Sequence, residues 1–219
     1  MDKTKVVIGY LVIVLSIVIS SCESKIKDRD GNIYKEVNIG KQKWMAENLT
    51  VCHFRNGDTI PEVRSAEDWI KSAVEGKPAW CYEENNPITG KKYGKLYNWY
   101  AVNDPRGLAP KGCHVPSDSE WKQFTDFFGG EISSAMQMRT SGLTGKSNGT
   151  FESGFSGLPG GNRSSNGTFF GIGSYGYWWS ATELNTSKAW IRILDYPHCN
   201  LNNIGLSKQY GLSVRCLRD

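Results

Sequence analysis

The sequence has few of the residues from which catalytic and metal centres are usually built. Only three histidines occur in 219 residues, and the chain has neither a CxxC pair nor an HxxxH spacing, although such spacings are typical of zinc sites. Nothing resembles a phosphate-binding glycine loop, a nucleophile beside a base and an orienting acid, or a pair of carboxylates framed by aromatic residues. These absences disfavour an enzyme, and we expect neither a cofactor nor a resident metal ion.

An excess of charge of one sign is also lacking. The chain carries 26 basic and 22 acidic side chains, and its formal net charge at pH 7 is +4. The two signs are interspersed along the sequence. So mild and scattered a charge does not predict binding to nucleic acid or to an anionic membrane patch.

Long hydrophobic runs are absent except at the N-terminus. Lys3 and Lys5 precede an uncharged run of 16 residues, 6–21, which is rich in Val, Ile and Leu. A membrane-spanning helix needs roughly 20 residues, so this shorter run predicts a signal peptide over residues 1–21. The run ends in Ile19-Ser20-Ser21-Cys22, which resembles the lipobox of bacterial lipoproteins. The alternative is an ordinary secretory signal followed by a chance cysteine.

The lipobox resemblance implies where the protein resides. Cleavage before Cys22 would make this residue the N-terminus and attach lipid to its sulfur. We therefore expect a lipid-anchored protein of the cell envelope, at the outer membrane and facing either the periplasm or the surface. Residues 22–30 are charged and have almost nothing to bury, so they are expected to form a tether. Residues 31–219 then form one domain.

The residue pattern of this domain predicts an α+β fold with two principal helices, a mostly antiparallel sheet and long irregular loops. Ser65 and the capping box from Ser117 to Glu120 each precede apolar residues at helical spacing, which predicts helices over 65–74 and 117–128. The expected strands are a hairpin over 31–46 that turns at Gly40, then 93–102, 175–182, 188–195 and 211–218. Residues 141–176 are expected to form ordered loops with short strands, and residues 196–210 an Asn-rich loop.

Several long motifs occur in one order along the chain. They are WMAENL (44–49), PAWCY (78–82), YGKLYNWYAVND (93–104), HVPSDSEW (114–121), SGLPGG (156–161), YGYWWSATE (175–183) and GLSVRCLRD (211–219). Together they resemble the Fibrobacter succinogenes major paralogous domain, a family of bacterial exported and lipoprotein domains, over residues 28–219. The resemblance implies a C-type lectin-like fold. HVPSDSEW is also similar to a segment of the formylglycine-generating sulfatase-modifying enzymes, which share that fold.

The resemblance marks Cys113 as unusual, because the family usually has tryptophan at this position. A cysteine in place of a buried aromatic residue leaves a void that costs about 3–5 kcal/mol unless neighbours fill it. Export permits disulfides, so a bridge from Cys113 to Cys216 is one expected compensation, with Cys199 and Cys52 as other partners. Buried reduced thiols are the alternative. Five cysteines remain after Cys22, so at least one of them stays unpaired within the chain.

Each histidine lies beside a cysteine, in Cys52-His53, Cys113-His114 and His198-Cys199. Sulfur and imidazole ligands suit zinc or copper. However, neighbouring side chains of an extended chain point to opposite faces, so one dipeptide is not expected to supply both ligands to one ion. The calcium-binding motifs of true C-type lectins are absent as well. The sequence therefore does not predict a metal site.

Ligands of lectin-like folds usually meet the loops above the final strands. Aromatic rings and asparagine amides in these loops are suited to stacking on and hydrogen bonding with glycans or an envelope protein. The candidate ligand-binding residues are Asn162, Arg163, Asn166, Tyr175, Arg192, Tyr196, His198, Asn200, Asn202 and Asn203. Alternatively, these residues only satisfy turns and fill the core. Two other classes stay open, namely a metal- or cysteine-dependent enzyme on a sulfatase-modifying-factor-like scaffold and a purely structural envelope or adhesion component.

Overall fold

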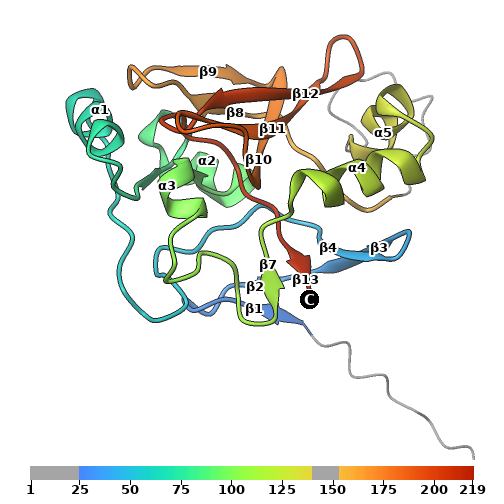
Figure 1. The fold of residues 1–219 in the computed structure, drawn as a ribbon, viewed down its shortest axis with the longest axis horizontal. Coiled ribbons are helices and arrows are strands. Elements are labelled where there is room, and N and C mark those ends of the chain that lie inside the picture. The colour runs from blue at the N-terminus through green and yellow to red at the C-terminus, as the bar shows by residue number, and fades with distance from the viewer. Residues whose placement is uncertain (1–24, 140–152) are drawn as a thin grey trace, which may run out of the picture.

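The computed structural model describes residues 25–139 and 153–219 (Figure 1). The predicted signal peptide and Cys22 lie outside this part of the chain. No helix among the described residues is long and apolar enough to cross a membrane. The strands of residues 160–207 gather at one end of the domain, and those of residues 26–45, 113–114 and 217–218 lie at the other end, where the chain enters at residue 25 (Figure 1).

A five-stranded sheet forms the first of these ends. Its strands are β8 (Gly160–Arg163), β9 (Phe169–Ile172), β10 (Tyr175–Glu183), β11 (Lys188–Asp195) and β12 (Asn200–Ser207), in the order β12-β11-β10-β8-β9. All neighbours are antiparallel except β8 and β10, which pair in parallel through Gly161 and Gly176. The strands predicted over 175–182 and 188–195 are confirmed.

A four-stranded sheet at the other end joins segments that are far apart in sequence. It has the order β3 (Glu36–Ile39), β4 (Gln42–Met45), β13 (Leu217–Arg218) and β7 (Cys113–His114). The predicted hairpin at Gly40 is confirmed and joins β3 to β4. Two further pairs are β1 (Ile26–Lys27) with β2 (Ile33–Tyr34), and β5 (Trp80–Cys81) with β6 (Leu96–Tyr97). The mixture of helices with mostly antiparallel sheets confirms the α+β class.

The two predicted helices are present. The helices of the described chain are α1 (Ala66–Val74), α2 (Pro87–Tyr93), α3 (Trp99–Val102), α4 (Asp118–Phe127) and α5 (Glu131–Met138), together with the short 3₁₀ helix Glu83–Asn85. Ser65 caps α1, and Ser117 and Glu120 form both halves of the predicted capping box of α4. The sequence did not reveal α5, because Gly130 begins this helix without a side-chain cap and Ile132 is exposed.

The aromatic stretch 93–102 is not the continuous strand that its composition predicts. Gly94 has a φ of 81°, which ends α2, and only Leu96–Tyr97 forms a strand. The side chain of Asn98 then accepts a hydrogen bond from the Ala101 N–H at 3.1 Å and begins α3. Buried aromatic residues suit a strand and a buried helical turn equally well, so composition alone could not separate the two.

Residues 200–207 form a strand instead of part of an Asn-rich loop. Each residue from Asn200 to Ser207 pairs with a residue of β11. Pairing with β11 satisfies the backbone hydrogen-bonding groups of these residues, and it overrides the low strand propensity of asparagine and glycine. In contrast, the strand predicted over 211–218 is reduced to Leu217–Arg218 and isolated bridges at Gly211, Leu212 and Ser213.

The predicted tether is partly structured. Ile26 in β1 is 3% exposed and belongs to the main hydrophobic core, and Asp28 accepts a hydrogen bond from the Tyr34 hydroxyl at 2.6 Å. The folded domain therefore begins before residue 31.

Arg215 is a fully buried arginine that joins distant segments of the core. It donates hydrogen bonds to the Asn48 side chain at 2.7 and 3.1 Å, to the carbonyls of Ala46 at 2.8 Å and Met45 at 3.2 Å, and to the Phe155 carbonyl. Its guanidinium also lies 4.2 Å from the centroid of the Phe155 ring. Because burial disfavours the charge, the pKa of Arg215 falls to about 9.

The five described cysteines are free thiols, so the expected Cys113–Cys216 disulfide is not formed in this structure. Cys113 pairs with Arg218 across β7 and β13, which makes Cys216 its diagonal neighbour. Diagonal neighbours have Cα atoms about 7–8 Å apart, whereas the Cα atoms of a disulfide are usually about 4.4–6.8 Å apart. Both cysteines instead pack as small apolar groups, 2% and 0% exposed respectively.

Candidate functional site

Asn162 and Arg163, two of the predicted ligand-binding residues, are buried and stabilise the fold instead. Arg163 is 1% exposed and donates hydrogen bonds to the carbonyls of Val63, Arg64 and Ser65 at 2.6 to 2.9 Å. It therefore ties β8 to the segment that leads into α1. Asn162 is 4% exposed, so it does not face a ligand either.

Two more members of the set have local structural roles. Tyr196 is 3% exposed and packs in the second core cluster with Leu194 and Leu201. The side chain of Asn166 is exposed but accepts hydrogen bonds from the Thr168 N–H at 3.0 Å and the Thr168 hydroxyl at 2.7 Å, which stabilises a turn. These two residues are removed from the candidate site.

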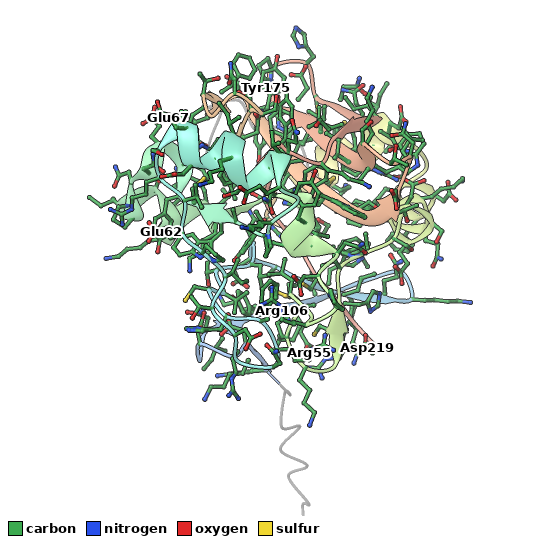
Figure 2. The ribbon with its side chains drawn as sticks, turned by 60° about the vertical axis from the view of Figure 1, so that its left-hand side comes forward. Arg55, Glu62, Glu67, Arg106, Tyr175 and Asp219 are labelled. Carbon is green, nitrogen blue, oxygen red and sulfur yellow. The ribbon has the colours of Figure 1, made fainter. Side chains whose placement is uncertain are left out.

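Tyr175 lies at one end of the molecule, well away from Arg55 and Asp219 (Figure 2). Its ring stacks on Phe170 with a centroid distance of 6.1 Å and an interplanar angle of 21°. Phe170 is 62% exposed, so this pair presents an aromatic surface. Across the sheet, Tyr175 pairs with Asp195, which in turn pairs with Asn200.

His198 lies in the turn that leads from β11 to β12, and Asn200 is the first residue of β12. The His198 side chain is exposed, and its Nδ1 lies 2.9 Å from Asp195 Oδ2. The amide of Asn200 donates a hydrogen bond to Asn202 Oδ1 at 3.1 Å. These contacts hold the turn while leaving the imidazole edge accessible.

The other predicted residues meet in a polar groove between α4, the start of α5 and β12. The groove has a volume of about 340 Å³ and is lined by Asp118, Lys122, Thr125, Asp126, Gly130, Glu131, Arg192, Leu201, Asn202 and Asn203. Arg192, Asn202 and Asn203 were predicted from the sequence. The acids and the lysine on α4 and α5 were missed, because isolated charges on a helix resemble ordinary solvated groups.

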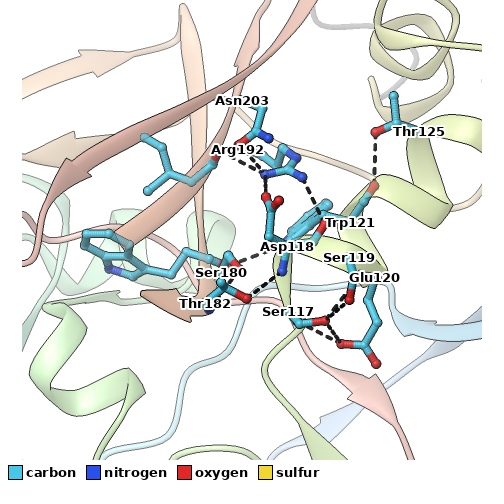
Figure 3. Close-up of polar contacts among 12 residues, drawn as sticks. Ser117, Asp118, Ser119, Glu120, Trp121, Thr125, Ser180, Thr182, Arg192 and Asn203 are labelled. Atoms are coloured by element: carbon cyan, nitrogen blue, oxygen red, sulfur yellow. Dashed lines mark hydrogen bonds and ion pairs between the residues drawn. The ribbon is translucent and has the colours of Figure 1, made fainter. Parts of the chain in front are cut away.

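Arg192 organises the floor of this groove (Figure 3). Its guanidinium is 3% exposed and donates to Asp118 Oδ1 at 2.8 Å and to Asn203 Oδ1 at 2.6 Å. Burial lowers the pKa of Arg192, and the hydrogen bond and charge of Asp118 oppose this effect. The fixed guanidinium therefore positions the carboxylate and the amide against each other. Lys122 and Asp126 form an exposed ion pair at 2.7 Å, and Asn202 Oδ1 accepts a hydrogen bond from the Asn200 amide.

A separate charged network involves the first turn of α4. His114 lies 2.8 Å from Glu120 Oε1 and 2.7 Å from Asp219 Oδ1. Burial alone would lower the pKa of His114, but the hydrogen bonds with Asp219 and Glu120 outweigh burial and raise it. The same contacts, with those of Ser117, hold the pKa of Glu120 below its usual value in spite of burial.

This network predicts a pH-dependent contribution to stability. A raised histidine pKa contributes stability that is fully present below the unfolded pKa near 6.5 and is lost as pH rises through the folded pKa. The loss of unfolding free energy in His114→Gln should therefore be larger at pH 5.5 than at pH 9, as measured by urea denaturation. Asp219→Asn should reduce this difference, and an equal loss for His114→Gln at both pH values would contradict the prediction.

Together, the fold and the groove define an α+β domain in which two sheets enclose an aromatic core and polar side chains converge beside an edge strand. The chain matches the Fibrobacter succinogenes major domain over residues 37–218 and belongs to that family. This match confirms the resemblance carried by the motifs. No curated protein and no solved structure matches the chain.

Proposed function

We propose that this protein is a lipid-anchored component of the bacterial cell envelope whose domain binds glycan or protein ligands without catalysing a reaction. The observation that carries the proposal is the polar groove between α4, α5 and β12, where amides, carboxylates and a lysine converge. Sugar hydroxyls both donate and accept hydrogen bonds, so a mixture of such groups suits them. Glycan is therefore the ligand class that we place first.

The lipid anchor and a C-type lectin-like fold are part of the same proposal. The lipobox-like segment ending at Cys22 supports lipid attachment, and hence a location at the outer membrane. The order of two capped helices followed by a late antiparallel sheet supports a relationship to the C-type lectin-like fold. In Figure 1 the groove-bearing strands β11 and β12 lie at the end opposite the entering chain, an arrangement suited to an anchored binding domain.

Asn202→Ala is expected to weaken glycan binding about tenfold. This corresponds to about 1.4 kcal/mol, the size of one hydrogen bond, because the variant removes a half-buried amide from the groove. The measurement is binding of the full-length protein, in detergent, to immobilised bacterial polysaccharides and a glycan array. The glycan that the wild type retains best is then titrated against the wild type and against Asn202→Ala.

Asn38→Ala provides the matched control, since Asn38 is an exposed amide on β3 outside the groove. Its affinity should equal that of the wild type. Asp126→Ala tests a second groove residue on α4. If neither groove variant changes the affinity, or if no glycan is retained, the glycan proposal fails. Co-purification with an envelope complex in the absence of glycan binding would favour the structural class instead.

A further inference from the structure

Three side chains with metal-binding atoms meet on the surface near the point where the described chain begins. The nearest ligand atoms of Asp30, Cys52 and His53 all lie within 4.8 Å of one another. Asp30 belongs to the turn between β1 and β2, and the other two follow the buried Val51. This cluster is separate from the polar groove and shares no residue with it.

The fold positions Asp30 firmly. In the turn, Asp28 Oδ1 accepts hydrogen bonds from the backbone N–H groups of Asp30 and Asn32, both at 2.9 Å. Asp30 Oδ2 in turn accepts the N–H of Cys52 at 2.5 Å, while Oδ1 faces His53 Nδ1 at 2.5 Å. One carboxylate oxygen is thus held by the backbone, and the other is directed at the imidazole. Hydrogen bonds of this kind orient the ligands of metal sites.

The Cys52-His53 dipeptide does not behave as the extended-chain argument predicts. Neither residue belongs to a regular strand, and His53 makes only an isolated bridge with Thr59. The imidazole turns back so that Nδ1, its nitrogen nearer the backbone, lies 3.5 Å from Cys52 Sγ. The two neighbouring side chains therefore present their ligand atoms to the same space.

The sulfur–nitrogen separation suits one tetrahedral ion. With Zn–S of about 2.3 Å and Zn–N of about 2.0–2.1 Å, tetrahedral angles put the two ligand atoms roughly 3.5 Å apart, the separation between Cys52 and His53 in the structure. The Asp30–His53 contact would have to open from 2.5 Å to about 3.3 Å. A small rotation of the imidazole supplies this change, because the His53 side chain is 38% exposed while the Asp30 side chain is 16% exposed and held by the Cys52 N–H.

We propose that Asp30, Cys52 and His53 form a zinc-binding site with three protein ligands and an open fourth position. Thiolate, imidazole and carboxylate are all ligands that Zn²⁺ accepts, and a sulfur ligand argues against Mg²⁺ or Ca²⁺. The fourth position is accessible, because His53 is 38% exposed at its side chain. His53 also lines a hollow of about 220 Å³ with Arg29, Arg55 and Lys111, so a small anion is the ligand that this position would take.

The zinc site and the hollow beside it share no lining residue with the proposed glycan groove. Zinc binding can therefore be tested independently of glycan binding, and the failure of one proposal does not imply the failure of the other.

The test uses the full-length protein in detergent, stripped of metal with a chelator and kept reduced. We expect one equivalent of Zn²⁺ to bind in competition with a chromophoric chelator. Co²⁺ in its place should give thiolate-to-cobalt charge-transfer absorption. Cys52→Ser should weaken Zn²⁺ binding at least tenfold and abolish this absorption. Asp30→Asn keeps the shape and the acceptor for the Cys52 N–H, and should also weaken binding by tenfold or more.

Cys199→Ser is the matched control, because Cys199 is also half-buried and also adjoins a histidine. This variant should bind Zn²⁺ as tightly as the wild type and keep the cobalt absorption. The proposal is overturned if the wild type binds no zinc, if Cys52→Ser binds it unchanged, or if binding follows Cys199. Thermal melting of each metal-free variant separates a lost ligand from a lost fold.

Discussion

Replacement of Arg215 by alanine is expected to remove at least about 4 kcal/mol from the free energy of unfolding. The guanidinium satisfies the buried Asn48 side chain and the carbonyls of Met45, Ala46 and Phe155. Each acceptor left without a donor in the core costs about 1–3 kcal/mol. Domains are commonly stable by only about 5–15 kcal/mol, so much of the variant should be unfolded or insoluble. Urea denaturation with tryptophan fluorescence measures the loss.

Two comparisons separate this network from a general effect of removing arginine. Arg64→Ala removes a side chain that is 64% exposed and pairs with Glu62 on the surface, and it should change stability by no more than about 0.5 kcal/mol. Arg215→Lys keeps the charge but offers one ammonium group in place of the planar fork. It should therefore remain strongly destabilised. A wild-type denaturation midpoint for Arg215→Ala would refute the assigned role.

The second large effect has the opposite sign. Glu83 is 2% exposed, and neither carboxylate oxygen has a hydrogen-bond partner among the described residues. Burial, with a smaller contribution from the charge of Glu84, raises the pKa of Glu83 to about 8. Glu83→Met should therefore stabilise the domain at pH 7, by up to about 3 kcal/mol at 1.36 kcal/mol per pKa unit.

The pH dependence distinguishes this effect from better packing. Between the unfolded pKa of 4.5 and the folded value of about 8, the folded domain holds a proton that the unfolded chain has released. The stability of the wild type therefore falls as pH rises through this window. The advantage of Glu83→Met should be small at pH 4.5 and largest near pH 8. Glu84→Met removes only the smaller contribution of the neighbouring charge, and should therefore show a much weaker trend. A pH-independent gain for Glu83→Met would contradict the assignment.

The sequence predicts local features of the fold better than it predicts the pairing of separate strands. Ser65 and Ser117 identify the starts of α1 and α4 because a cap and the helix it begins are close in sequence. The side chains of residues 188–195 alternate between two faces, and this alternation predicts the strand β11. The strand over 200–207 could not be foreseen in the same way, because β11 determines it and its own residues favour turns.

The same limit applies to the candidate site. Arg192, Asn202 and Asn203 were predicted and do converge, since they lie on paired strands. Asp118 was not predicted, because an isolated acid in the first turn of a helix resembles a solvated group, yet the docking of α4 on the sheet places it against Arg192. Residue type could not distinguish these groups from Tyr196, because a tyrosine suits a binding surface and a core equally well.

The position of β13 has a consequence for how the domain forms. This strand lies between β4 and β7, although it follows both of them in the chain. Until it arrives, β4 and β7 have no common neighbour, and Arg215 is not in place to satisfy the carbonyls of Met45 and Ala46. A chain that emerges N-terminus first during synthesis would therefore leave this edge of β4 unpaired until residues 215–218 had been made. The core around Arg215 could close only after that point.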